Sequence, residues 1–330
     1  ASQVSDEPLP NGNRLNIGAY GGTAQASLSP PGRRLVLLNP VGGSVLRGVC
    51  SVAWSAFGPD WAAEDTVRIE LSSDDGLTWI PLPDAGDLPW DGQQVSCDTA
   101  TWNPSTTPLA RLRVVWNGDA NLSAASARIT LRNEAIRYYV NDGSTVNDAW
   151  CTAPGDDSSY DGLTPDTPRA TVQSILTDYD LEPGDIVHID TGTYDLTSDI
   201  AIGSGDAGNS DAQVVFEGSP YGVTINRNEG SDGCAWYVGA PYVTIRTATS
   251  TRFPGLAARL MTVTGAQTGV KFYMNQGNYG VLSRVELTDN TRGVDVTASA
   301  VTVENCVIRG GHTGIYLYGR ASSDRPIRNC

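Results

Sequence analysis

Short runs of alternating hydrophobic and polar residues recur along the chain, separated by clusters of Gly, Pro, Asn and Asp. An alternation of period two is that of a β-strand with one buried face, and the intervening residues favour turns. In the first half, Val67 and Ile69 belong to such a run, and the pair Asp75-Gly76 that follows it predicts a hairpin turn. The pattern therefore predicts a β-sandwich over residues 30–134.

The second half begins with a turn-rich stretch and then contains one segment with helical periodicity. Val172 and Ile175 recur at helical spacing, while Thr167 can act as N-cap with Pro168 at the first helical position. We predict a helix over about residues 168–180. Because strand-like runs follow it, we expect this helix to cap the open hydrophobic end of a stack of strands.

A sequence repeat near the end of the chain predicts how those strands stack. The segments LSRVEL, VENCVI and IRNC align so that Val285, Cys306 and Cys330 share one position, at intervals of roughly twenty residues. Asn305 and Asn329 align as well, which predicts an asparagine ladder at a turn. A chance alignment of three short segments is the alternative. We prefer a parallel β-solenoid in which the three residues form one inward stack.

Two segments of the second half resemble a known family. GDIVHIDTGTYDL resembles the first coil of secreted right-handed parallel β-helix proteins, which include polysaccharide lyases and non-catalytic relatives, and DGLTPDTPRATVQSIL resembles the segment before that coil. The Ser-x-Asp-Gly-x-x-Trp pattern at residues 73–79 is similar to hairpins in immunoglobulin-like modules of bacterial surface proteins. The resemblance implies an all-β protein, extracellular or at the cell surface, with an immunoglobulin-like sandwich at 30–134 and a right-handed parallel β-helix at 135–330 with one N-terminal capping helix.

The segment PNGNRLNIGAYGG, within residues 1–29, resembles the closing stretch of β-helix domains in large secreted repeat proteins of planctomycete-like bacteria. Here it precedes the sandwich. Either the chain is one period of a longer tandem protein, or this tail docks on the last coil of a neighbouring copy and builds a head-to-tail filament. The residues expected to meet in that contact are Leu15, Ile17 and Tyr20 of the tail with Ile315, Leu317 and Ile327 of the other copy.

Charge and composition narrow the class of partner. Lys and Arg total 22 against 37 Asp and Glu, which gives a net charge of −15, and Lys271 is the single lysine. This balance argues against a protein that follows the phosphates of a nucleic acid. No apolar run approaches the roughly 20 residues that a membrane-spanning helix needs. We expect no nucleic acid and no transmembrane segment, and a surface polysaccharide is a candidate partner.

The six cysteines form no CxxC pair and the two histidines lack zinc-ligand spacing, so we expect no structural zinc. Cys50 and Cys97 lie in two strand-like runs that a sandwich can bring together, which makes them disulfide candidates. The acidic loops contain no complete calcium-binding pattern, and Asp and Asn there most often serve turns. If the chain binds Ca²⁺, the expected ligands are Asp156, Asp157 and Asp161.

Catalytic chemistry is harder to locate. A polysaccharide lyase needs a base and cationic groups that stabilise the enolate, and Lys271 is the candidate base. No cluster of Arg accompanies Lys271 in the sequence, so we interpret it as a surface residue and assign no catalytic residue. The expected function is that of an extracellular structural or adhesive surface protein. The alternatives are a polysaccharide-active β-helix enzyme, lyase or hydrolase, with an accessory sandwich, or a glycan-binding module without turnover.

Overall fold

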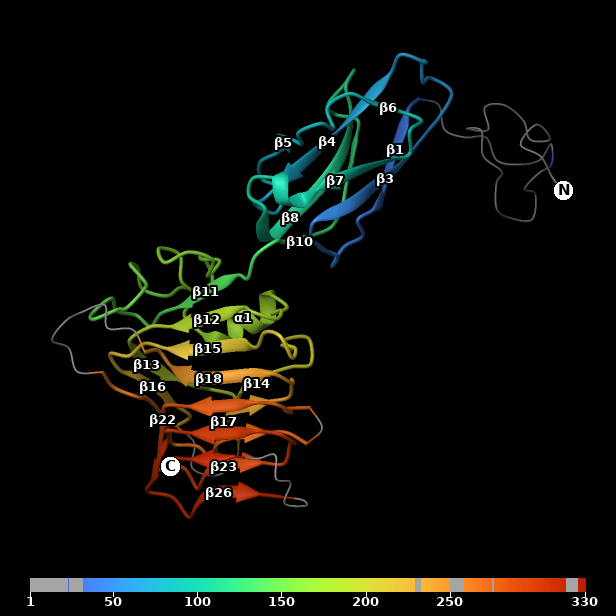
Figure 1. Cartoon of the computed structure of the whole chain (residues 1–330). Helices are drawn as coiled ribbons and strands as arrows, with labels where there is room; N and C mark the ends of the chain where they lie inside the picture. Colours follow the sequence, from blue (N-terminus) through green and yellow to red (C-terminus); the bar gives the residue numbers. More distant parts are fainter. Residues whose placement is uncertain (1–22, 24–31, 229–232, 250–257, 275, 319–325) are drawn as a thin grey trace. The chain divides into compact units, whose positions relative to one another are not determined.

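The computed structural model describes residue 23 and residues 32–228, 233–249, 258–274, 276–318 and 326–330. The chain divides into two compact units, Ala1–Glu134 and Ala135–Cys330 (Figure 1). Regular structure in the described residues is nearly all β, and several sheets are parallel, so the predicted all-β class is confirmed. No helix among these residues is long and apolar enough to cross a membrane.

Two sheets with a shared apolar core make up the first unit. One has the order β1-β3-β7, and the other has the order β2-β10-β8-β4-β5 with β6 on β4 and β9 on β8. The core forms because alternate residues of facing strands point inward, as Trp54 of β3 and Val67, Ile69 and Leu71 of β4 do. The strands are β1 (Arg34–Asn39), β2 (Val45–Leu46), β3 (Val49–Phe57), β4 (Thr66–Ser72), β5 (Ile80–Pro81), β6 (Leu88–Pro89), β7 (Gln94–Asp98), β8 (Thr106–Trp116), β9 (Ser123–Ala125) and β10 (Ile129–Arg132).

The predicted hairpin is present between β4 and β5, which pair antiparallel. Its connection is longer than a two-residue turn, because the last pair of the ladder is Leu71 with Ile80. Asp75 and Gly76 both have positive φ, 58° and 97°, as the sequence pair suggested. The Asp74 carboxylate accepts hydrogen bonds from the backbone N–H and hydroxyl of Thr78, which closes the loop.

The second unit consists of three parallel sheets. Sheet I has the order β11-β12-β15-β18-β21-β24-β27, sheet II the order β13-β16-β19-β22-β25, and sheet III the order β14-β17-β20-β23-β26. From β12 onward, each coil of the chain adds one strand to each sheet in turn. The strands are β11 (Arg137–Val140), β12 (Ile186–Ile189), β13 (Gly192–Asp195), β14 (Ile200–Ile202), β15 (Val214–Gly218), β16 (Val223–Asn226), β17 (Cys234–Val238), β18 (Val243–Thr247), β19 (Met261–Thr264), β20 (Thr268–Phe272), β21 (Val281–Ser283), β22 (Val285–Thr288), β23 (Arg292–Val296), β24 (Thr302–Glu304), β25 (Val307–Arg309), β26 (Thr313–Leu317) and β27 (Ile327–Arg328).

The repeat predicted near the end of the chain is found in the register of these strands. β22 pairs with β25 and β24 with β27, so that Val285, Cys306 and Cys330 occupy equivalent positions. Val285 and Cys306 are buried, whereas Cys330 is exposed. The asparagine ladder is also present, because the side chain of Asn329 donates to Oδ1 of Asn305 over 3.1 Å.

Helix α1 spans Val172–Asp178, so the prediction that it begins near residue 168 with Thr167 as N-cap is wrong. The N-cap is Thr171, whose side-chain oxygen accepts from the N–H of Ser174. The residues before it cannot be helical because Arg169 forms a parallel bridge with Val140 of β11. Local sequence preference predicted a helix from about residue 168, but pairing of Arg169 with strand β11 keeps these residues extended.

A buried pair of carboxyl groups holds the loop that follows β11. The Asp190 carboxylate accepts the backbone N–H groups of Ala149, Trp150 and Cys151. Asp148 is 9% exposed, and its Oδ1 has no hydrogen-bond partner among the described residues. Burial, followed by the nearby Asp190 charge, raises the pKa of Asp148 to about 7. This carboxyl is therefore an incompletely satisfied group inside the second unit.

Candidate functional site

The outward face of sheet III carries a row of polar and aromatic side chains across four neighbouring strands. The parallel register places Tyr237 of β17 beside Lys271 of β20, Lys271 beside Asp295 of β23, and Asp295 beside Tyr316 of β26. These side chains point outward because the alternate residues of the same strands fill the core. We call Tyr237, Lys271, Asp295 and Tyr316, together with the adjoining Arg292 and Tyr273, the sheet III strip.

Asp295 is the most buried polar member of the strip, with 4% of the residue exposed. Its Oδ2 lies 3.3 Å from Nη1 of Arg292, while its Oδ1 has no hydrogen-bond partner among the residues that the structure describes. The guanidinium of Arg292 also lies over the ring of Tyr316, 4.7 Å from its centroid. Asp295 and Tyr316 thus orient an arginine whose side chain is 45% exposed.

Lys271 lies next to two tyrosines near the β17 side of the strip. Its Nζ is 5.7 Å from the centroid of the Tyr273 ring, and Tyr273 packs against Tyr237 with centroids 5.3 Å apart. Burial raises the pKa of Tyr237, so its hydroxyl stays protonated near neutral pH. Tyr273 and Tyr316 are each 37% exposed and present part of their rings to solvent.

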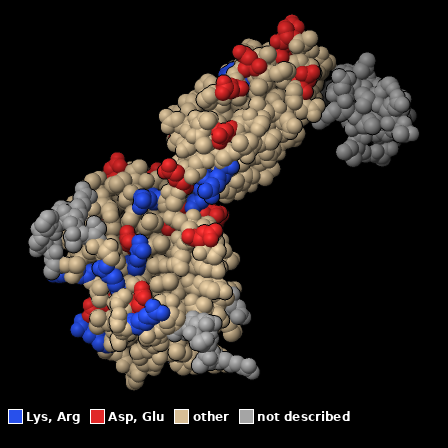
Figure 2. All heavy atoms as spheres, viewed as in Figure 1, with Lys and Arg blue, Asp and Glu red and all other residues tan. Residues whose placement is uncertain are grey.

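Together these groups offer two cations, two partly exposed aromatic rings and one buried carboxylate oxygen. Arginine matches the planar geometry of a carboxylate with two parallel N–H groups, and lysine adds a point charge. Aromatic rings supply flat apolar area beside these polar groups. The arrangement suits a ligand that is linear, carries carboxylates and has weakly polar faces. On the second unit, acidic and basic groups are interspersed over the face shown in Figure 2, so long-range attraction is not the main determinant of ligand binding there.

Lys271 lies on the outward face of β20, and the register places Asp295 opposite it. Arg292 lies one coil further along the chain, at the start of the strand that pairs with β20. The sequence contains a pattern from which this cluster of side chains could have been predicted. The three segments TGVKF, RGVDV and TGIYL share a Gly at the second position. Aligning them places Lys271, Asp295 and Tyr316 at one position.

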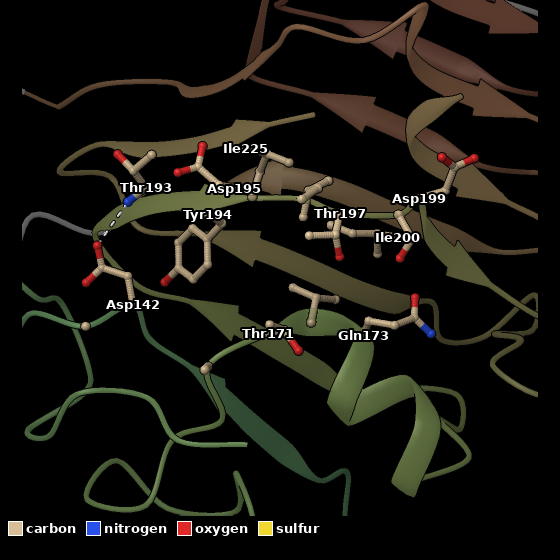
Figure 3. Close-up of a pocket in the computed structure, with 15 residues that line it drawn as sticks. Asp142, Thr171, Gln173, Thr193, Tyr194, Asp195, Thr197, Asp199, Ile200 and Ile225 are labelled. Atoms are coloured by element: carbon tan, nitrogen blue, oxygen red, sulfur yellow. Dashed lines mark hydrogen bonds between the residues drawn. The ribbon is translucent and has the colours of Figure 1, made fainter. Parts of the chain in front are cut away.

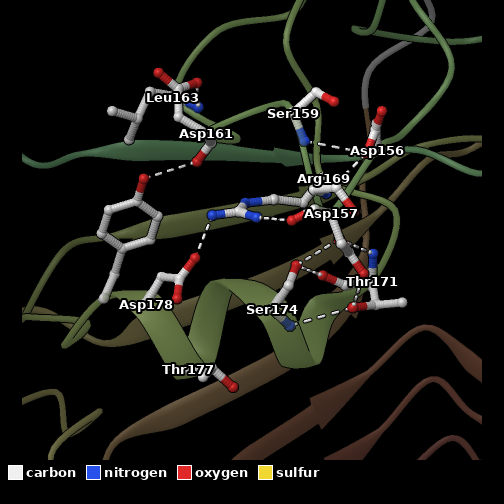
Figure 4. Close-up of polar contacts among 12 residues, drawn as sticks. Asp156, Asp157, Ser159, Asp161, Leu163, Arg169, Thr171, Ser174, Thr177 and Asp178 are labelled. Atoms are coloured by element: carbon white, nitrogen blue, oxygen red, sulfur yellow. Dashed lines mark hydrogen bonds and ion pairs between the residues drawn. The ribbon is translucent and has the colours of Figure 1, made fainter. Parts of the chain in front are cut away.

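The structure does not bring the candidate calcium ligands together. The Asp156 carboxylate accepts the N–H groups of Ser158 and Ser159, and Asp161 accepts the N–H of Leu163 (Figure 4). These are the local bonds of Asx-type turns. No group of three or more His, Cys, Asp or Glu residues placed to hold a metal ion occurs in the part of the chain described.

Asp157 is used differently, as a clamp on the start of α1. Its Oδ1 accepts the backbone N–H of Ala170 and the hydroxyl of Ser174, and its Oδ2 accepts the hydroxyl of Thr171 (Figure 4). The side chain of Arg169 lies alongside, paired with Asp178 at the end of the helix. The carboxylate of Asp157 therefore has a structural role at the cap.

Cys50 and Cys97 lie directly opposite each other on the antiparallel strands β3 and β7. Both side chains pack against the core of the first unit. In this structure they are free thiols, and burial raises the pKa of Cys97 to about 11. A disulfide between them stays a prediction, which peptide mapping under non-reducing conditions tests.

The expected assembly contact is described on one side only. Leu15, Ile17 and Tyr20 lie outside the described residues. On the other side, Ile315 is half-buried, while Leu317 and Ile327 are 47% and 43% exposed. They belong to β26 and β27, the last described strands of sheets III and I.

Comparison with protein-family models, with curated proteins and with solved structures finds no match to this chain. The resemblance to secreted β-helix proteins and immunoglobulin-like modules therefore rests on the sequence segments themselves.

Proposed function

We propose that this chain is an extracellular adhesive surface protein that binds an acidic polysaccharide along the sheet III strip. In this proposal the first unit is an immunoglobulin-like sandwich and the second a right-handed parallel β-helix. The rotation of successive strands through three parallel sheets supports the β-helix. The two sheets around one core, with the Ser-x-Asp-Gly-x-x-Trp hairpin, support the sandwich.

The observation that carries the ligand class is the oriented Arg292, whose partner Asp295 lies opposite Lys271 on the neighbouring strand. Asp295 and Tyr316 hold the guanidinium in place, so little side-chain entropy remains to be lost when it binds a carboxylate. The strip crosses four strands at about 4.8 Å per strand, which makes it about 14 Å long. An extended polymer lying across the strands can meet Tyr237, Lys271, Arg292 and Tyr316 in succession.

Binding to a uronate polymer and to a neutral polymer tests the proposal. We expect polygalacturonate or alginate to bind, and a neutral glucan to bind at least about tenfold more weakly. Arg292→Ala should weaken uronate binding about tenfold, since one charge-assisted pair is lost. Arg309→Ala is the matched control, because Arg309 is an exposed arginine on sheet II. Equal effects of the two variants would contradict the proposal.

Turnover of the same polymer is the second candidate function, favoured by Lys271 lying in the strip with Arg292. In β-elimination a base removes the proton next to the uronate carboxyl, the glycosidic C–O bond breaks, and a carbon–carbon double bond forms. The ultraviolet absorbance of that double bond measures it. Absorbance that grows with wild type and is lost in Lys271→Ala would assign an enzyme, whereas binding without absorbance assigns an adhesive protein.

Head-to-tail assembly is a separate proposal. The exposed Leu317 and Ile327 support it, because exposed apolar side chains gain from being covered. Deleting residues 1–27 should abolish concentration-dependent growth of the light-scattering mass. A full-length chain that stays monomeric at high concentration would refute this contact.

A further inference from the structure

A cavity of about 400 Å³ lies between the start of α1 and strand β13 (Figure 3). Eight consecutive residues, 193–200, form one wall, and residues 170–173 with Asp142 and Gly143 form the other. This wall comprises most of β13, the bend at residues 196–199 and the first residue of β14. We call the part of the cavity that borders β13 the slot.

The strand that lines the slot is the free edge of sheet II. β13 pairs with β16 on one side only, and the N–H groups of Gly192 and Leu196 donate to the β16 side. Since N–H groups alternate in direction along a strand, those of Thr193 and Asp195 face the slot. Thr193 donates to Oδ2 of Asp142 over 3.0 Å. The N–H of Asp195 has no hydrogen-bond partner among the described residues.

In the two neighbouring sheets, the outer edge of the first strand is covered by other residues. In sheet I, β11 is the outer strand, and its N–H groups at Tyr139 and Asn141 donate to the carbonyl oxygens of Gly162 and Arg169. In sheet III, α1 packs on β14, where the side chain of Gln173 accepts the N–H of Ala201. Sheet II alone presents unpaired backbone at this end of the described unit, and unpaired strand edges recruit further strands.

The lining of the slot specifies the side chains of an incoming strand. Its apolar residues are Val172, Leu196, Ile200 and Ile225, whereas its charged residues, Asp142, Asp195 and Asp199, are all acidic. A strand added at the edge turns alternate side chains to the two faces of the sheet. Apolar side chains would cover the half-buried Leu196 at the mouth of the slot, and basic side chains would meet the carboxylates.

We propose that the free edge of β13 binds an extended segment of a partner protein, about four residues long, in which apolar and basic residues alternate. The segment adds to sheet II as an outer strand, takes a hydrogen bond from the N–H of Asp195, and places its basic groups beside Asp142 and Asp195. The site is separate from the sheet III strip, so this binding does not depend on the polysaccharide.

Synthetic peptides test the proposal with the full chain. A capped decapeptide of alternating Val and Arg should bind, as measured by fluorescence anisotropy, and should slow hydrogen exchange at the N–H of Asp195 at least about tenfold. A Val and Glu decapeptide, or the Val and Arg peptide with alternate backbone nitrogens methylated, should bind at least about tenfold more weakly. Equal affinity of the methylated peptide would overturn the proposal.

Asp195→Pro is the decisive variant, because proline removes the N–H that faces the slot and leaves the bonds to β16 in place. We expect it to weaken the Val and Arg peptide about tenfold, and Asp195→Ala, which keeps the N–H, to weaken it only a few-fold. Circular dichroism checks that both variants are folded. If the proline variant does not fold, binding of the methylated peptide to the wild-type chain provides the same test. Equal losses in the two folded variants, or protection of Asp195 by a neutral oligosaccharide instead of the peptide, would refute strand addition.

Discussion

Each unit contains a carboxylate set among cations and aromatic rings, and the two clusters differ in how completely that carboxylate is satisfied. In the first unit, Glu70 is 4% exposed and bonds Arg68 through one oxygen and Arg113 through the other, each over 2.7 Å. Arg113 also lies over the ring of Trp79, 4.4 Å from its centroid. In the sheet III strip, Asp295 is equally buried, yet one oxygen has no partner in the described chain.

The difference shows that composition alone does not identify a binding surface. The Glu70 cluster uses its hydrogen-bonding capacity internally and so stabilises the sandwich-like unit. The sheet III strip leaves capacity unused and exposes part of its rings, which is the condition for binding a ligand. Substitutions in the two clusters should accordingly have opposite consequences for stability and for binding.

Glu70→Ala should have the largest effect. It leaves Arg68 and Arg113 without their shared partner, and we expect a loss of about 2–4 kcal/mol in the free energy of unfolding, measured with urea. Burial raises the pKa of Glu70, but the hydrogen bonds from Arg68 and Arg113 outweigh it and hold the pKa below 4.5. The contribution is therefore complete above pH 4.5 and is lost as the pH falls through the folded-state pKa. A loss that does not decrease as the pH is lowered from 7 through the acid range would contradict the electrostatic cause.

Asp148→Asn should stabilise the second unit at alkaline pH. The folded-state pKa of about 7 lies above the usual 3.8, so the stability associated with Asp148 is highest at low pH, declines between these values, and is fully lost above pH 7. Asparagine removes this loss, which gives a gain of about 2–4 kcal/mol at pH 8 and little change at pH 4. Thermal unfolding at both pH values measures it. If Asp148→Asn lowers the stability of the protein equally at pH 4 and pH 8, then Asp148 is ionised and fully hydrogen-bonded in the folded protein.

Arg292→Lys should change binding while barely affecting stability. Lysine keeps the charge but lacks the planar pair of donors, so we expect uronate affinity to fall about five- to tenfold. The free energy of unfolding should shift by less than about 0.5 kcal/mol, because the side chain is 45% exposed and its ion pair lies near the surface. Retention of full affinity would show that charge alone matters at this position.

Asp295→Asn should have a much smaller effect on folding than Glu70→Ala. The carboxylate has one partner, so replacing it with an isosteric amide should change the free energy of unfolding by less than about 1 kcal/mol. A loss as large as that expected for Glu70→Ala would abolish the contrast between the two clusters. Urea unfolding of the two variants side by side makes the measurement.

Hydrophobic periodicity predicted much of the architecture because it reports which residues face a core. The runs around Val67 and Ile69 became strands with those side chains buried, and the alignment of Asn305 with Asn329 became a hydrogen-bonded ladder. These features depend on residues close in sequence or on a regular repeat. The start of α1 was missed because its position depends on a bridge between Val140 and Arg169, which local propensities do not report.

The candidate site was missed for a related reason. Lys271, Asp295 and Tyr316 meet because successive coils place them in register, and the coils differ in the length of their connections. A search for clustered cations along the sequence cannot find such a group. The Gly shared by TGVKF, RGVDV and TGIYL marks the register, and the structure gives a reason for glycine at this position. A Cβ at Gly293 would lie 2.6 Å from the carbonyl oxygen of Gly314 in the adjacent strand.

The parallel register gives the second unit a fixed spacing between equivalent residues of successive coils. Because every coil advances by the spacing of hydrogen-bonded strands, equivalent outward residues recur about every 4.8 Å along the stack. That pitch is fixed by the backbone and cannot adjust to a ligand. If the repeat length of a polymer differs from this strand spacing, the offset between polymer units and protein residues grows with each unit. Matched contacts can then form only over a limited number of units. Affinity should therefore rise with oligomer length at first and then level off, and the length at which it does so measures the mismatch between the two lattices.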